Sequence, residues 1–260
     1  MPIQHGIKGV DDGHFRQYPP DNELGLGWDQ DAPLYAAQKT LGSMPGLERI
    51  MRLSPCMGTT IMNADNANLW NRTAASMVRS PICPCDGVVT ANPNVALALA
   101  NGDCPAAIVW NMSGGDPFIA LLHCGLGALV PKNGEPGILE KFFLGYLNRN
   151  RMYVALGYGI GPCCYALNRL PELTANAHID AWPVRGMTVR DGQPAYRLDL
   201  IALMRAQCRY MGLRDEQILA GNLTLPCTAC KKTDTGRHMY RSNLREGPNA
   251  DRNLVYALMD

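Results

Sequence analysis

The chain has 260 residues, of which 47% are hydrophobic and 18% are charged. This balance is typical of a packed globular protein, and it excludes a disordered or fibrous chain. The formal net charge of +1 lacks the basic excess of proteins that bind nucleic acids or anionic membranes, so we expect neither as a partner.

Strand-like and helix-like segments follow one another without strict alternation. The strands are predicted as short apolar runs between turn signals, and the helices from residues that recur at three- and four-residue steps. In chain order we expect helices over 32–42 and 65–79, strands over 86–90, 95–100, 105–110 and 117–123, a helix over 137–151, a strand over 152–158, and helices over 197–211 and 251–259. This mixture predicts an α+β domain with mixed sheets, which we expect to span residues 1–260 as one unit.

The cysteines and histidines indicate a compartment and exclude one kind of site. Residues 1–15 lack the apolar core of a secretory signal, and the apolar stretch 118–130 is too short to span a bilayer. We therefore expect a cytoplasmic protein whose ten cysteines are reduced. Five histidines cannot build a conventional multicopper oxidase, which needs about ten imidazole ligands.

Two cysteine motifs invite a metal-site interpretation. Cys227 and Cys230 form a lone C-x-x-C, and a zinc ribbon needs a second pair at suitable spacing. The motif at 83–85 is too tight and too remote in sequence to supply that pair. The adjacent Cys163 and Cys164 are interpreted as packing residues in a tight turn.

A hairpin provides the strongest candidate site. If the strands 105–110 and 117–123 pair so that Trp110 lies opposite Pro117, then Cys104 lies directly across from His123. A cysteine and a histidine at that separation can act as a thiolate–imidazolium pair or as two metal ligands. A slip of one residue in the register would place them on opposite faces, and an inert buried pair is the alternative.

Ordered motifs around this hairpin resemble the laccase-domain proteins, the multicopper polyphenol oxidase family that also includes purine nucleoside phosphorylases. Residues 101–105 (NGDCP) resemble the family's A-D-C-x-P, and His123-Cys-Gly resembles the start of its H-A-G-W-R-G. The similarity extends in order along nearly the whole chain through the segments 86–90 (DGVVT), 159–165 (GIGPCCY), 198–200 (LDL) and 227–228 (CT).

The resemblance implies a fold and a kind of site. The implied fold is a four-layer α/β/β/α sandwich, similar to the catalytic domain of cytotoxic necrotizing factor. The implied site is a His-Cys-His cluster that binds zinc or copper, in which Cys104 and His123 are the second and third members. The implied substrates are purine nucleosides, for phosphorolysis or adenosine deamination, and Arg241 and Arg252 are the expected phosphate-binding residues.

The chain departs from the family pattern at several site positions. Met57 stands where the family has its first histidine, so Met57 becomes the third candidate metal ligand. Cys56, Cys124 and His238 are possible substitutes for it as metal ligands, and of these only His238 could replace the missing imidazole. The arginine of H-A-G-W-R-G is absent, and Ala166 replaces a family glutamate.

Three functions therefore stay open on the sequence alone. The leading one is an enzyme that acts on a purine nucleoside, with phosphate as the second substrate in phosphorolysis. The second is a copper-dependent polyphenol oxidase with a sulfur-rich site. The third is a non-catalytic relative that keeps the fold and binds a metal or a partner.

Overall fold

The computed structural model describes most of the chain. The described residues are 3–8, 41, 46–53, 55–69, 78–79, 84–111, 116–132, 134–145, 149–172, 178–219, 227–247 and 252–259. The helix expected over 32–42 lies, apart from Leu41, outside these residues, as does most of the one expected over 65–79. The described ends of the latter form the turn η2 (Ala67–Leu69) and the strand β4 (Val78–Arg79).

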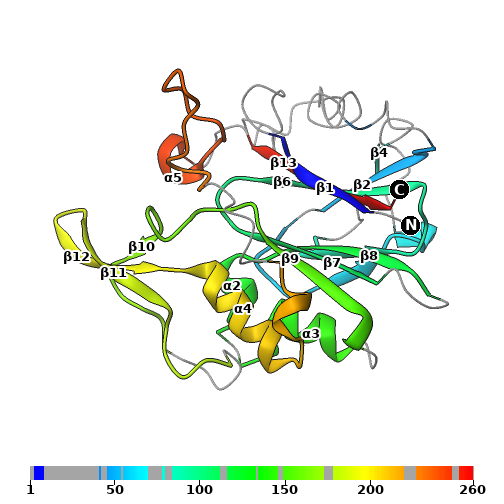
Figure 1. Cartoon of the computed structure of the whole chain (residues 1–260), viewed down its shortest axis with the longest axis horizontal. Coiled ribbons are helices and arrows are strands. Elements are labelled where there is room, and N and C mark those ends of the chain that lie inside the picture. The colour runs from blue at the N-terminus through cyan, green and yellow to red at the C-terminus, as the bar shows by residue number, and fades with distance from the viewer. Residues whose placement is uncertain are drawn as a thin grey trace, which may run out of the picture.

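Two five-stranded sheets form the centre of the molecule (Figure 1). The first has the order β1 (Ile3–Lys8), β13 (Asn253–Met259), β6 (Val95–Asn101), β2 (Arg49–Arg52) and β4. The second has the order β3 (Ile61–Asn63), β5 (Gly87–Thr90), β8 (Phe118–His123), β7 (Ala106–Asn111) and β9 (Met152–Gly157). Both sheets combine parallel and antiparallel pairs, which confirms the predicted mixed α+β class.

The remaining elements lie outside these two sheets. A small sheet has the order β10 (Ala166–Leu167), β12 (Gln193–Leu198) and β11 (Val184–Arg190). The helices α2 (Leu126–Leu129), α3 (Ile138–Leu144) and α4 (Leu200–Tyr210) gather on the side of the second sheet, and α5 (Asn243–Glu246) lies apart from them (Figure 1). Short 3-10 turns complete the described part: η3 (Arg149–Arg151) and η5 (Asp215–Gln217).

Three apolar layers hold these elements together. One lies between the helices and the second sheet and includes Phe142, Val154 and Leu203. Another lies between the two sheets, and a third packs Leu41 on the outer face of the first sheet. Because the strand faces are buried on both sides, the strands appear in the sequence as continuous apolar runs.

The helix α4 shows why one sequence prediction was accurate. The Asp199 carboxylate accepts a hydrogen bond from the Ala202 N–H at 2.9 Å and caps the first turn. The buried side chains then recur on one face: Leu200, Leu203, Met204, Gln207 and Cys208. The spacing of the buried residues and the Asp199 cap both indicate a helix, and the structure confirms one within the predicted range 197–211.

The helix predicted over 251–259 is wrong. Residues 253–259 form strand β13, which pairs with β1 on one side and with β6 on the other. All but one of its residues are buried. A short apolar run fits either a buried helix or a central strand. Here the edges of β1 and β6 provide hydrogen-bond partners on both sides, so the run forms a strand.

Candidate functional site

The Cys–His hairpin is present, but its register differs from the prediction by two residues. His123 lies opposite Ala106, and Asn111 lies opposite Phe118. Asn111 therefore belongs to the strand, whereas the prediction placed it in the turn. A shift of two residues preserves the face of the sheet, so Cys104, just before β7, is a diagonal neighbour of His123. The Cys104 side chain is hydrogen-bonded to the imidazole.

Asp86 is a third member of this arrangement. It precedes strand β5, and its Oδ1 lies 2.8 Å from His123 Nδ1. The side chains of both residues are almost completely buried. The backbone fixes the pair as well, because the His123 N–H donates to the Asp86 carbonyl at 2.7 Å. The order Asp86, His123, Cys104 is that of a thiol site in which a carboxylate orients the imidazole.

The charge state of His123 follows from these neighbours. Burial favours the neutral ring and lowers its pKa. The hydrogen bonds with Asp86 and Cys104, together with charge attraction, outweigh burial and raise the pKa of His123 to about 9. Burial also raises the pKa of Asp86, but the hydrogen bonds from His123 and Cys56 lower it overall. At neutral pH the pair is therefore an imidazolium beside a carboxylate.

The same carboxylate organises the loop 56–58. Its Oδ2 accepts from the N–H groups of Cys56 and Gly58 at 3.3 and 2.8 Å, and its Oδ1 accepts from the Met57 N–H at 3.1 Å. The Cys56 Sγ also lies 3.0 Å from Oδ2. These bonds hold Met57 at a φ of 61°, a left-handed conformation that is uncommon for a methionine and recurs at functional sites.

Gly125 brings two sulfur atoms together. A Cβ atom at this position would lie 3.0 Å from Met57 Sδ and 3.2 Å from Cys104 Sγ, so both side chains pack against the bare glycine. Met57 therefore lies at the site next to Cys104, although its side chain is 48% exposed. Two sulfurs and one imidazole now share one small region.

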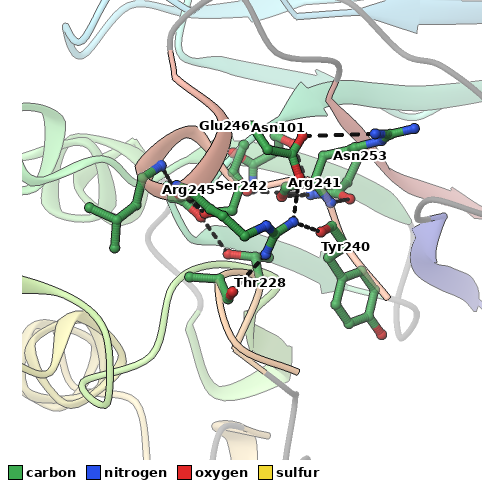
Figure 2. A network of polar contacts seen from close by, with 12 residues as sticks. Asn101, Thr228, Tyr240, Arg241, Ser242, Arg245, Glu246 and Asn253 are labelled. Carbon is green, nitrogen blue, oxygen red and sulfur yellow. Dashed lines mark hydrogen bonds and ion pairs between the residues drawn. The ribbon is translucent and has the colours of Figure 1, made fainter. Parts of the chain in front are cut away.

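A network of polar contacts fixes the loop that carries Cys104 (Figure 2). Asn101 Nδ2 donates to the Cys104 carbonyl and, at 2.8 Å, to the Tyr158 carbonyl. Asp103 accepts from the hydroxyls of Thr228 and Ser242 at 2.8 and 3.1 Å. The position of Cys104 therefore depends on segments more than 100 residues further along the chain.

The side chain of Asn253 connects the rest of this network. Its Nδ2 donates to the carbonyls of Arg241 and Asn101, and its Oδ1 accepts from the Arg241 N–H. Figure 2 shows Asn101, Arg241 and Asn253 close together, with α5 beside them. Asn253 is fully buried, so these bonds are shielded from water.

The other predicted site residues lie in varied surroundings. Arg252 places its Nε 3.6 Å from the Cβ position of Gly102, close in sequence to Cys104. Arg241 lies 3.8 Å from Glu246, so its charge is partly neutralised. Cys124 is fully buried in the layer between helices and sheet, and His238 lies on a loop beside Arg245 and Lys232.

Sequence reasoning missed two features. Asp86 was matched to a family strand but not assigned to the site, and a lone acid directly before a buried strand was the available signal. The second feature is a cysteine cluster. Among the residues that the structure describes, one group of three or more His, Cys, Asp or Glu side chains brings its ligand atoms within 4.8 Å of one another: Cys163, Cys164, Cys227 and Cys230.

The motif resemblance has an independent counterpart. The family model described as "Multi-copper polyphenol oxidoreductase laccase" matches residues 17–243 of this chain. The chain belongs to this laccase family. A search of curated proteins found no match.

Solved structures support the fold of this laccase-family member. The hypothetical protein YfiH of Bacillus licheniformis is 17% identical with a TM-score of 0.67, and the alignment covers 99% of this chain and 93% of that one. YlmD of Geobacillus stearothermophilus is 21% identical with a TM-score of 0.63, covering 99% and 90%. Protein NMB0706 of Neisseria meningitidis is 17% identical with a TM-score of 0.62, covering 99% and 94%.

In the part of the chain that the structure describes, every helix is too short or too polar to cross a membrane.

Proposed function

We propose that this laccase-family chain is an enzyme that acts on a purine nucleoside, with Cys104 and His123 as the catalytic pair and Asp86 as the positioning residue. The observation that carries the proposal is the hydrogen-bonded series from Asp86 through His123 to Cys104 at the end of the second sheet. The motif resemblance supports the substrate class, because the family includes purine nucleoside phosphorylases.

The chemistry of both candidate reactions suits a protonated imidazole. Phosphorolysis expels a purine base from C1′ of the ribose, and deamination expels ammonia from C6 of adenosine. Each leaving group is a nitrogen that must gain a proton as its bond to carbon breaks. His123 holds such a proton at neutral pH, since its neighbours raise its pKa to about 9.

Cys104 has a different role in each of the two reactions. In deamination the Cys104 sulfur attacks C6, ammonia leaves with the proton from His123, and water then cleaves the carbon–sulfur bond to return the thiol. In phosphorolysis the phosphate oxygen attacks C1′, and Cys104 keeps the imidazolium in place. Arg252, which lies against Gly102, is the candidate phosphate-binding residue, and Arg241 is the second.

Product analysis after incubation with adenosine, with and without phosphate, tests the proposal. Phosphate-dependent release of adenine indicates phosphorolysis, and inosine without phosphate indicates deamination. Cys104→Ala and His123→Asn are each expected to lower the rate by about 100-fold or more. Cys208→Ala, which removes a buried thiol of helix α4 that contacts neither Cys104 nor His123 in the hydrogen bonds above, should keep the activity. Full activity of Cys104→Ala would show that the site is assigned wrongly.

A second function is favoured by the sulfur atoms around Gly125. Cys104, Met57 and the His123 imidazole are a donor set that suits one soft copper ion, whereas a methionine is not a usual zinc ligand. Such an ion would supply one-electron oxidation of a phenol. Five histidines do not provide the imidazoles of a multicopper centre, so the residues fit a single ion only.

Copper-dependent oxidation of a phenolic compound separates this alternative from the first. Colour that requires added copper, and that Met57→Ala abolishes, would favour the oxidase. Inactivity in both assays would favour a relative that keeps the fold without catalysis.

A further inference from the structure

Four cysteines from two distant segments meet away from the catalytic pair. Cys163 and Cys164 lie in the turn after strand β9, and Cys227 and Cys230 lie in a turn before α5. More than 60 residues separate the two turns, yet the four sulfur atoms lie within 4.8 Å of one another. From this juxtaposition we infer that these cysteines form a structural zinc site.

The separations of the sulfur atoms match a shared metal ion better than disulfides. Cys163 Sγ and Cys230 Sγ are 3.5 Å apart, whereas a disulfide requires about 2.0 Å. Four thiolates about 2.3 Å from a tetrahedral zinc ion lie about 3.8 Å from each other. All four cysteines are free. The cluster therefore requires only small movements to surround an ion.

The backbone around Cys227 is arranged as in a metal-binding turn. N–H groups of Gly161, Ala229 and Cys230 donate hydrogen bonds to the Cys227 sulfur. Such bonds orient a metal ligand and stabilise its charged form. The turn closes with a hydrogen bond from the Lys231 N–H to the Cys227 carbonyl at 3.1 Å.

The two turns are built to approach each other closely. A Cβ atom at Gly161 would lie 3.2 Å from Cys227 Cβ and 3.3 Å from Cys163 Sγ, tighter than most real contacts. Any larger residue would therefore push the two turns apart. The cysteines are not core residues either, because Cys163 and Cys230 are exposed and the other two are half-buried. Partly exposed thiols without core packing are typical of a ligand set rather than of inert cysteines.

The charge around the cluster suits four thiolates and a divalent ion, which together carry two negative charges. Lys231 and Lys232 follow Cys230 directly. The Arg245 guanidinium donates to the Ala229 carbonyl at 2.6 Å, inside the C-x-x-C turn. Arg245 is also paired with Glu246, so these positive groups offset part of the charge of the site.

The site would also support the catalytic loop. Thr228, between the two ligands of the C-x-x-C turn, bonds through its hydroxyl to Asp103, the neighbour of Cys104. The Thr228 N–H donates to the Gly159 carbonyl at 3.2 Å. An ion that holds the two turns together therefore also holds the loop on which Cys104 lies. This role does not depend on which reaction Cys104 performs.

Zinc analysis of the full chain tests the inference. Protein expressed in zinc-containing medium and purified under reducing conditions without metal-affinity resin is expected to carry about one zinc ion per chain at this site. Cys163→Ser, Cys164→Ser, Cys227→Ser and Cys230→Ser should each reduce the content to near zero. Cys208→Ala and Cys104→Ala are matched controls that should keep the ion, and Cys104→Ala separates this site from the proposed catalytic one.

A second measurement covers variants that fail to fold. Zinc is removed from the wild-type chain by a chelator and then returned, while amide hydrogen exchange is followed at Cys164, Tyr165 and Lys231. We expect exchange at these turns to rise without zinc and to fall when zinc is restored. Wild-type protein without zinc that does not bind added zinc, zinc that persists in the four serine variants, or disulfides among these cysteines in thiol-blocked protein would each overturn the inference.

Discussion

Asp86→Asn should change both the stability of the chain and the charge of His123. In the wild type, one oxygen of Asp86 faces His123 Nδ1 and Met57 N–H, and the other faces the N–H groups of Cys56 and Gly58. An asparagine has only one accepting oxygen. If that oxygen keeps its bonds to the N–H groups of Cys56 and Gly58, the amide nitrogen faces the imidazole and the Met57 N–H loses its acceptor. His123 must then accept at Nδ1, become neutral, and carry its proton on Nε2.

The magnitude follows from the pKa of His123. Its rise from 6.5 to about 9 corresponds to about 3.5 kcal/mol at about 1.4 kcal/mol per tenfold change in proton affinity. A raised histidine pKa stabilises the folded state. This stabilisation is complete below the unfolded pKa near 6.5 and is lost as the pH rises through the folded pKa of about 9. The hydrogen bond with Asp86 is the largest single contribution to this rise, and Cys104 contributes as well. We therefore expect Asp86→Asn to lower the free energy of unfolding by about 2–3 kcal/mol near pH 6 through this effect.

Chemical denaturation between pH 6 and 10 measures the difference between wild type and variant. This difference should shrink as the pH rises from about 6.5 to about 9. What remains above pH 9 reflects the bonds to the 56–58 loop, which do not depend on His123. Imidazole NMR titration should show His123 changing charge near pH 9 in the wild type and well below it in Asp86→Asn. Asp116→Asn, an exposed acid, is the control. A wild-type His123 that titrates near 6.5, or a difference that is constant with pH, would refute the reasoning.

Three other substitutions test separate parts of the structure. Met57→His restores the family imidazole at a left-handed position that histidine tolerates, and isothermal titration should show copper or zinc binding at least about tenfold tighter, with Met187→His as an exposed control. Gly159→Ala places a Cβ 2.6 Å from the Pro105 backbone, so thermal and denaturant unfolding should show a loss of about 2–3 kcal/mol, against little change for Gly145→Ala. Asn253→Ala leaves the buried carbonyls of Asn101 and Arg241 without this donor and should lower the free energy of unfolding by about 2–4 kcal/mol. Asn253→Asp should not recover that stability, because a carboxylate cannot donate. Equal stability of the wild type and both variants would contradict this role of Asn253.

The elements around the site could be predicted from the sequence because each combines a local signal with a matching environment. The strands β7 and β8 are apolar runs bounded by prolines and turn residues, and they lie where expected. The register was off by two because Asn111, a common turn residue, pairs with Phe118 instead. Local preference could not decide this, since the fit of the whole sheet sets where a strand ends.

The sequence could not predict contacts between remote segments. Asp86 reaches His123 across 37 positions, and the cysteines at 163–164 meet those at 227 and 230 only through the folded backbone. The C-x-x-C was recognised, but its partner is an adjacent pair rather than a second C-x-x-C, so no spacing rule identified it. The position of Met57 beside Cys104 was implied by the family motif and depends on the bare surface of Gly125.

The place of strand β13 has a consequence for how the protein is made. This strand separates β1 from β6 in the first sheet, although it follows both in the chain. As the ribosome extends the chain, β1 and β6 must wait for residues 253–259 with their edges unpaired, and Asn253, which fixes the Cys104 loop, arrives in the same segment. A nascent chain stalled before this segment would therefore expose two strand edges whose backbone N–H and C=O groups can pair with other chains. We expect such a chain to depend on chaperones until synthesis passes that point.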